Sequence, residues 1–288
     1  MAQDESTPDL LVFPKFFFQH GPGVAELADR IIECGFDGVD VIIRERAWCK
    51  EDDYFESLPA FAKHMRSRGL KVYTATTNWM HDKVAAIEDS YMLFADNGIT
   101  MFRFFMQRYR GRGTYREDLL QCRKSLERLE ELGLQYGITA LLQIHGRSLT
   151  WSPATASSMV QGLDPRGVAI HYDPGNMCLQ EGWTDSVKAV DVLGEYLAYV
   201  GAKNGEWSSA PDRDGDNQLK WRAKWTQLAC GMIDWEVVLN ELKAADYDGP
   251  ICIHNFYDGS LQELVETTTM DVKYMRRLMK AVWSQQAE

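Results

Sequence analysis

Two neighbouring stretches, ITALLQIHGR at residues 138–147 and GVAIHYDPGN at residues 167–176, decide the predicted fold. Each is a short apolar run that ends in polar residues, and a helical segment of ordinary length separates them. This order of strand, helix and strand is typical of a parallel α/β protein, in which the chemistry lies at the carboxyl ends of the strands.

The polar residues of these two stretches fall on matching faces of the predicted strands. Gln143 and His145 share one face of the first strand, and His171 and Asp173 share one face of the second, because side chains two apart on a strand point the same way. We therefore expect four groups that bind metal ions or carry protons to converge on one opening.

The composition limits the class of protein. The chain has 288 residues, 45% hydrophobic and 25% charged, which suits one large α/β barrel or two smaller domains. It has no run of about 18 apolar residues, so the sequence predicts no membrane span. The formal net charge of -11 argues against nucleic acid and anionic membranes as partners, because phosphate groups bind clustered Lys and Arg.

Two further features predict a cytoplasmic protein. The N-terminal residues MAQDESTPD are acidic and polar, which is typical neither of a secretory signal nor of a basic transit peptide. The six cysteines are scattered without a CxxC motif, so we expect reduced thiols.

Eight apolar runs alternate with eight helical patterns along the chain. Such alternation implies parallel strands joined by right-handed crossovers, and eight units in this length predict a single (β/α)8 TIM barrel of the α/β class. An open doubly wound sheet is the alternative, but the Gly-rich GxGxxG turn that it needs does not occur. The predicted strands cover residues 10–18, 36–43, 70–79, 99–107, 138–145, 167–173, 196–203 and 249–256.

We expect one domain over residues 1–288, with an N-terminal tail at 1–9 and a long loop at the barrel mouth over 204–231. The DRDGDN motif at residues 212–217 lacks the glycine position and the bidentate Glu of a calcium loop, so we interpret it as solvated. Three tryptophans in this predicted loop, Trp207, Trp221 and Trp225, suggest a lid or a contact with another subunit.

Three phrases resemble one family. GFDGVDV at 35–41, HYDPGN at 171–176 and GMIDWEVVLNELKAADYDGPICIH at 231–254 resemble the xylose-isomerase-like sugar phosphate isomerase/epimerase TIM barrels. The resemblance implies a divalent metal at the carboxyl face of the barrel, held by Glu from strand five, Asp from strand six, His or Gln from strand seven and Glu from strand eight. In that family the two Glu residues often also act as the acid and base.

This sequence keeps one of those ligands and changes three. Asp173 matches the strand-six Asp, whereas Gln143, Gly201 and His254 stand where Glu, His or Gln, and Glu are expected. Lys203 matches the Lys of the family's strand-seven HxKD pattern. The predicted metal ligands are therefore Gln143, Asp173 and His254, a set with one carboxylate that binds Mg²⁺ weakly and favours Mn²⁺, Co²⁺ or Zn²⁺.

The absence of both family Glu bases leaves histidine as the predicted proton carrier. His254, with His145 as a second candidate, is predicted to be catalytic because His titrates near neutral pH. Structural roles in the core are the alternative for both. The predicted substrate-binding residues, whose alternatives are ion pairs and packing, are Arg103, Asn176, Lys203 and Trp79.

These features predict a metal-assisted isomerase or epimerase that abstracts a proton next to a carbonyl of a sugar, keto-sugar or polyol derivative. A lyase or dehydratase acting on a keto-sugar is the first alternative, since elimination also begins with proton abstraction. The second is a catalytically altered barrel that binds a carbohydrate or supports a partner subunit. A homo-oligomer and a hetero-oligomer are both compatible with the sequence.

Overall fold

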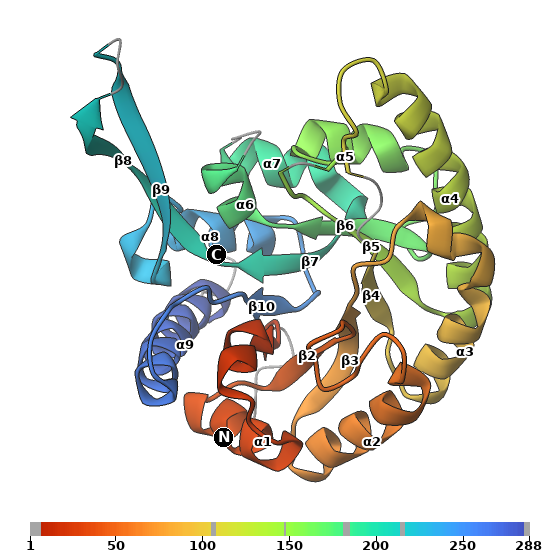
Figure 1. Cartoon of the computed structure of the whole chain (residues 1–288), viewed down its shortest axis with the longest axis horizontal. Helices are drawn as coiled ribbons and strands as arrows, with labels where there is room; N and C mark the ends of the chain where they lie inside the picture. Colours follow the sequence, from red (N-terminus) through yellow and green to blue (C-terminus); the bar gives the residue numbers. More distant parts are fainter. Residues whose placement is uncertain (1–6, 105–107, 147, 181–184, 214–216, 285–288) are drawn as a thin grey trace.

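The computed structural model describes residues 7–104, 108–146, 148–180, 185–213 and 217–284. Eight parallel strands form a closed barrel in the order β1-β10-β7-β6-β5-β4-β3-β2, which confirms the predicted (β/α)8 TIM barrel (Figure 1). The barrel strands are β1 (Leu10–Val12), β2 (Gly38–Ile42), β3 (Lys71–Thr76), β4 (Met101–Phe104), β5 (Thr139–Gln143), β6 (Val168–Tyr172), β7 (Leu197–Ala202) and β10 (Ile251–Ile253).

Helices surround the strands on the outside of the barrel (Figure 1). Pro and Ser at the start of α5 form the predicted cap, in which Ser152 accepts a hydrogen bond from the backbone N–H of Thr155. The α-helices are α1 (Val24–Cys34), α2 (Tyr54–Ser67), α3 (Glu88–Asp96), α4 (Tyr115–Tyr136), α5 (Pro153–Val160), α6 (Pro174–Leu179), α7 (Ser186–Leu193), α8 (Trp235–Ala244) and α9 (Leu261–Trp283). Short 3-10 helices are η1 (Pro14–His20), η2 (His81–Ala86), η3 (Gly194–Tyr196) and η4 (Leu228–Cys230).

The first predicted strand, at residues 10–18, is shorter than expected. It ends at Val12, and η1 follows from Pro14. Proline has no N–H for a strand ladder and is favoured in the first turn of a helix, so it ends the strand here. The FFF run that resembled strand sequence packs instead as a helical turn, with Phe16 and Phe17 buried.

Side chains alternate along each barrel strand between two apolar clusters. The larger cluster lies between the strands and the helices and contains, for example, Ala140 and Leu142 of β5. The smaller cluster contains Leu141 from the same strand, with residues of other strands. Because the side-chain period of a strand is two, Gln143 lies on the same face as Leu141. The smaller cluster consists of Leu11, Phe13, Ile42, Ala47, Leu141, Ala169, Tyr199 and Cys252.

The predicted loop over 204–231 is wrong for most of its length. Strands β8 (Asn204–Arg213) and β9 (Leu219–Thr226) pair antiparallel and form a hairpin that stands away from the barrel (Figure 1). The polar composition suggested a loop, but the tryptophans of β9 lie at paired positions, with Trp221 opposite Ser209 and Trp225 opposite Gly205. Residues 214–216 of the DRDGDN motif lie outside the described residues.

Strand β1 begins at Leu10, directly after the predicted N-terminal tail at 1–9. Residues 1–6 lie outside the described part of the chain, but Asp9 is fixed by the Lys71 ammonium of β3 at 2.6 Å and by the Tyr73 hydroxyl at 2.9 Å. Within the described residues, no helix is long and apolar enough to cross a membrane.

Candidate active site

A cavity of about 350 Å³ opens at the carboxyl ends of the barrel strands. Five of its lining side chains are cationic, and none of its described lining residues is Asp or Glu. Such a cavity suits an anionic ligand, because the cations raise the local potential in a site partly shielded from water. The lining residues are Phe13, Lys15, Arg44, Thr76, Asn78, Arg103, Arg108, Gln143, His145, Asn176, Gln180, Lys203, Trp225, His254 and Phe256.

The Asp173 carboxylate lies next to this cavity and is completely buried. Its Oδ1 accepts the backbone N–H of Asn176 at 2.9 Å, which caps helix α6. Its Oδ2 accepts the Asn176 amide at 2.8 Å, the Gln143 amide at 2.6 Å and the Lys203 ammonium at 2.9 Å. Burial raises the pKa of Asp173, and the charge of Lys203 opposes that rise.

Lys203 directly follows β7, and its ammonium is held from two sides. Opposite Asp173, the ammonium lies 5.0 Å from the ring centroids of both Trp225 and Phe256. These two rings stack on each other at 5.2 Å, so the hairpin end and the loop after β10 together cover the lysine. Burial lowers the pKa of Lys203, and the Asp173 carboxylate opposes this effect.

Two buried imidazoles, His171 and His254, lie beside this ion pair. Their rings meet edge to face at 5.3 Å, and Phe13 stacks on His254 at 4.6 Å. Burial lowers the pKa of both histidines well below the ordinary value, and the charges of Lys203 and Arg103 lower it further. Both rings are therefore neutral at pH 7, and no hydrogen-bond partner lies within the described residues for either Nε2 atom.

Gly201 explains why His171 fits at this position. A Cβ atom on residue 201 would lie 2.5 Å from Nε2 of His171 and 3.4 Å from Oδ2 of Asp173. The position where the family resemblance places the strand-seven metal ligand therefore has no side chain, and the His171 ring fills the space. A period-two pattern in β6 already placed His171 and Asp173 on one face, but did not show that the ring depends on Gly201.

His145 and Arg103 lie on the cavity wall. His145 donates a hydrogen bond from Nδ1 to the carbonyl of Gly146, so Nε2 is the acceptor nitrogen of its neutral ring. Burial lowers the pKa of His145 to about 4. The Arg103 guanidinium donates to the carbonyl of Thr77 at 2.7 Å and to the side chain of Asn78 at 3.3 Å, which orients it at the end of β4.

The structure brings most of the predicted site residues together at this cavity, and their roles stay predictions. Asp173 lies next to the cavity, and the cavity lining includes Arg103, Gln143, His145, Asn176, Lys203 and His254.

Trp79, predicted to bind substrate, does not line the cavity. Its ring packs in the apolar core against Tyr54 at 5.4 Å, Phe94 at 6.0 Å and Phe102 at 6.1 Å. The reason is that Trp79 lies in the turn after β3, where the backbone N–H binds the Thr77 hydroxyl and the indole lies against the helix side of the barrel.

Other cavity residues carried only a weak sequence signal or none. Lys15 and Arg44 are polar residues soon after strands β1 and β2, a position that favours the barrel mouth. Trp225 reaches the cavity only because β8 and β9 pair in one register, which a loop prediction does not contain.

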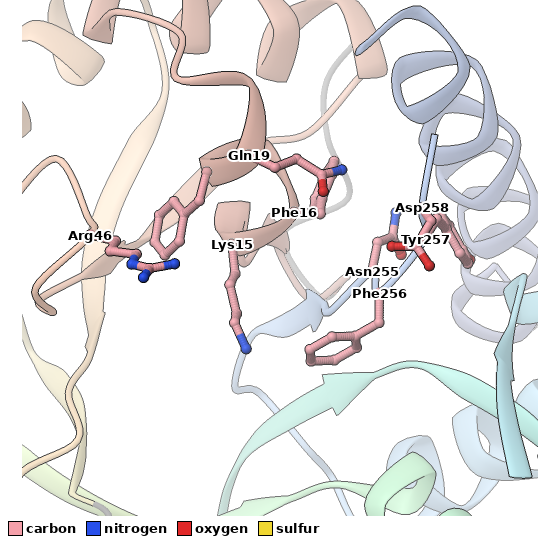
Figure 2. Close-up of a pocket in the computed structure, with 9 residues that line it drawn as sticks. Lys15, Phe16, Gln19, Arg46, Asn255, Phe256, Tyr257 and Asp258 are labelled. Carbon is pink, nitrogen blue, oxygen red and sulfur yellow. The ribbon is translucent and has the colours of Figure 1, made fainter. Parts of the chain in front are cut away.

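A second cavity, of about 400 Å³, lies next to the first, and Lys15 and Phe256 line both. Figure 2 shows Lys15 and Phe256 extending side by side, with Arg46 on one side and Asp258 on the other. The Lys15 ammonium lies 5.3 Å from the Phe256 ring centroid. This outer cavity extends the mouth of the inner one.

The sequence model of the xylose isomerase-like TIM barrel family matches residues 28–278. The chain belongs to this family. No curated protein sequence matches the chain at a significant level.

Several solved structures share the fold at low identity. One is a xylose isomerase-like TIM barrel protein from Mycobacterium smegmatis in complex with magnesium, with 16% identity, a TM-score of 0.71 and coverage of 98% of this chain and 99% of that one. The probable 3-DHS dehydratase AsbF of petrobactin synthesis from Bacillus anthracis has 13% identity, a TM-score of 0.70 and coverage of 93% and 98%. The 3-keto-D-glucoside 4-epimerase YcjR from E. coli, in its apo form, has 17% identity, a TM-score of 0.67 and coverage of 94% and 99%.

The residues of this family member only partly suit the divalent metal that the resemblance implies. His171, Asp173 and His254 bring ligand atoms within 4.8 Å of one another, so imidazole and carboxylate donors are present. However, the carboxylate already accepts four hydrogen bonds, one from the Lys203 ammonium, and the predicted ligand Gln143 donates its amide to that same carboxylate. With the cationic cavity lining, this charge distribution does not fit a divalent cation.

Proposed function

We propose that this family member is an enzyme that transfers a proton on the carbon next to a carbonyl group of a small, anionic carbohydrate derivative. The observation that carries the proposal is the cavity itself, in which five cationic side chains and no described carboxylate surround neutral imidazoles. Sugar epimerases and a probable dehydratase among the structural neighbours support a reaction of this general class.

His254 is the proposed proton acceptor. Its Nε2 atom is buried, neutral and without a partner among the described residues, and its ring lines the cavity. When it removes the proton, the C–H electron pair forms the C=C bond of an enediolate and the carbonyl oxygen gains the negative charge. Return of the proton by His254 to the neighbouring carbon, with transfer of the hydroxyl proton to the former carbonyl oxygen, completes an isomerisation. An epimerisation instead needs a second proton from the opposite face, which the neutral Nε2 of His145 does not carry.

The cations of the cavity have two proposed tasks. Arg44 and Lys15 attract the anionic group of the substrate, and Arg103, fixed by Thr77 and Asn78, faces the developing oxyanion. A bound anion also offsets the charges of Lys203 and Arg103, which lower the pKa of His254. Binding of the correct substrate therefore makes the imidazole a stronger base.

The predicted ligand set of Gln143, Asp173 and His254 for Mn, Co, Zn or Mg has no part in this proposal, because the charges around Asp173 do not fit a dication. A lyase or dehydratase reaction on a keto-sugar begins with the same proton abstraction and differs only in the loss of a leaving group. The test therefore measures proton abstraction itself.

A catalytically altered barrel that only binds an anionic carbohydrate is the second candidate. One observation favours it, because the cavity lining contains no described carboxylate base and burial lowers the pKa of His145 to about 4. A base of such low pKa is deprotonated at pH 7 but accepts a proton weakly.

Solvent deuterium exchange distinguishes the two candidates. The protein is incubated in D₂O with a panel of keto-sugar phosphates and keto-sugar acids, and NMR follows loss of the C–H signal next to the carbonyl. The wild type should exchange the C–H proton of at least one substrate. The exchange rate of His254→Ala should be lower by more than ~10²-fold while the variant remains folded. His64→Ala, on the outer helix α2, should keep the exchange rate of the wild type. Saturable binding without exchange in the wild type would favour the binding barrel.

A further inference from the structure

The Lys203 ammonium occupies the side of Asp173 at which a cation would bind. The Nζ–Oδ2 distance is 2.9 Å, and the side chains are 5% and 0% exposed. A metal ion that used Oδ2 as a ligand would lie within a few ångströms of this ammonium. Like charges at that separation repel strongly in a site shielded from water.

Contacts along the whole Lys203 side chain hold its ammonium next to Asp173. A Cβ atom on Gly175 would lie 2.4 Å from Cγ of Lys203, so glycine in the first turn of α6 leaves room for the lysine stem. At the other end, Trp225 and Phe256 stack together and contact the ammonium through their faces. The lysine cannot leave Asp173 without also losing these aromatic contacts.

The two imidazoles and Asp173 form a set of possible metal ligands, and the Lys203 ammonium lies against the carboxylate of that set. His171, Asp173 and His254 offer ligand atoms within 4.8 Å of one another, and the Nε2 atoms of both histidines lack partners among the described residues. Two imidazoles and one carboxylate are a common set for transition metals. The ligand types therefore suit a metal, whereas the ammonium and the other cations of the cavity oppose it.

We propose that Lys203 is a built-in cation that replaces the divalent metal of this site and excludes metal ions from His171, Asp173 and His254. For the proposed proton transfer, and resting on that proposed function, the Lys203 ammonium adds its positive charge to that of Arg103 beside the substrate oxyanion. The exclusion of metal is a property of the protein alone, so it is measured without any substrate.

The test is a titration of chelator-treated protein with Zn²⁺ and with Mn²⁺, in which isothermal titration calorimetry measures the binding. The wild type should show no saturable site that depends on Asp173. Lys203→Met should gain one Zn²⁺ site per chain, with an affinity at least ~100-fold higher than that of any Zn²⁺ binding to the wild type. Removal of the ammonium removes a like charge beside the ligands. The double variant Lys203→Met with Asp173→Asn should lose the gained site.

Lys15→Met is the matched control, because Lys15 also lines the cavity, whereas the ammonium that pairs with Asp173 in the described part of the chain is that of Lys203. It removes the same charge and should gain no Zn²⁺ site. Lys203→Gln, which keeps a hydrogen-bond donor for Asp173, replaces Lys203→Met if the latter does not fold, and the same gain is expected.

Two results would overturn the proposal. One is a stoichiometric Zn²⁺ or Mn²⁺ site in the wild type that Asp173→Asn removes. The other is failure of the folded Lys203 variants to gain a site. Either result leaves the proton-transfer proposal standing, since deuterium exchange tests that separately, and absence of exchange leaves the metal result unaffected.

Discussion

Asp40 and Asp173 are both completely buried carboxylates of the barrel, but they have different partners. Asp40 in β2 accepts hydrogen bonds from the hydroxyl groups of Thr74, Thr76 and Tyr199, and burial raises its pKa to about 6. Asp173 accepts from two side-chain amides, a backbone N–H and the ammonium of Lys203. Neutral donors surround the first carboxylate, and a charged donor binds the second.

The difference shows what each carboxylate does. Neutral hydroxyl donors supply the hydrogen bonds of Asp40 but no opposite charge, which suits a structural role. An ion pair removed from water has a large desolvation cost, so Asp173 and Lys203 keep both charges only because each holds the other. The Asp173 region therefore contains a fixed positive charge next to the cavity, whereas the side chains that donate to Asp40, including the cavity-lining Thr76, are uncharged.

The largest predicted effect separates these two regions. Asp173→Asn leaves Lys203 buried without a counter-ion and should lower the free energy of unfolding by about 3–5 kcal/mol. Asp40→Asn should change it by less than about 1.5 kcal/mol at pH 7, because relief of the buried charge offsets weaker hydrogen bonds to the threonines. Urea unfolding of both variants measures the difference, and equal losses would contradict the distinction.

The pH dependence of stability should come mainly from the three histidines at the cavity, and the raised pKa of Asp173 opposes part of their effect. Burial lowers the pKa of His145 to about 4 and that of His171 and His254 well below the ordinary value, so the unfolded chain binds more protons below pH 6.5. Stability should therefore fall on acidification by about 1.4 kcal/mol per pH unit for each imidazole.

Asp40 acts in the opposite direction. Because its folded-state pKa is raised to about 6, the folded state binds more protons between pH 4 and pH 6, and stability falls there as the pH rises. His171→Gln should reduce the loss of stability between pH 7 and pH 5, and Asp40→Asn should increase it. Unfolding curves at both pH values decide this, and unchanged slopes in both variants would contradict the assignment.

Gly201→Ala tests the packing of the Asp173 region. The new Cβ would lie 2.5 Å from Nε2 of His171, so the ring must shift and the free energy of unfolding should fall by about 1–3 kcal/mol. Gly23 is a matched control, because a Cβ there would have no neighbour within 4 Å. Equal thermal stability of Gly201→Ala and Gly23→Ala would show that His171 does not depend on residue 201.

The smallest predicted effect concerns the aromatic cover of Lys203. Trp225→Leu removes one ring that faces the ammonium and should lower stability by about 0.5–2 kcal/mol. Trp221→Leu on the same strand, where the side chain is 59% exposed, is the control and should have a smaller effect. If the two variants lose equal stability, the contact between Trp225 and Lys203 contributes nothing measurable.

The sequence predicted the barrel because the alternation of apolar runs and helical patterns is local and repeated. The period-two pattern placed Gln143 and His145 on one face of a strand, and both line the cavity, whereas His171 and Asp173, placed on one face of the next strand, do not line it. The sequence predicted the ends of the strands less well, as the early end of β1 at Val12, before Pro14, illustrates.

The partners within the site were harder to predict, because they depend on contacts between distant segments. The pairing of Lys203 with Asp173 depends on the space left by Gly175, and the position of Trp225 depends on the hairpin register. Trp79 follows β3 as the polar mouth residues follow their strands, but its large apolar surface packs against Phe94 and Phe102 instead. Residue type alone does not distinguish these outcomes.

The most direct test of the built-in cation is anomalous diffraction at the zinc absorption edge, from crystals of the wild type grown with excess Zn²⁺. We expect the Lys203 ammonium to lie against Asp173, at the 2.9 Å of the present structure, and we expect no anomalous peak between His171, Asp173 and His254. An anomalous peak about 2.0–2.2 Å from these three side chains, with Lys203 turned away from Asp173, would contradict it.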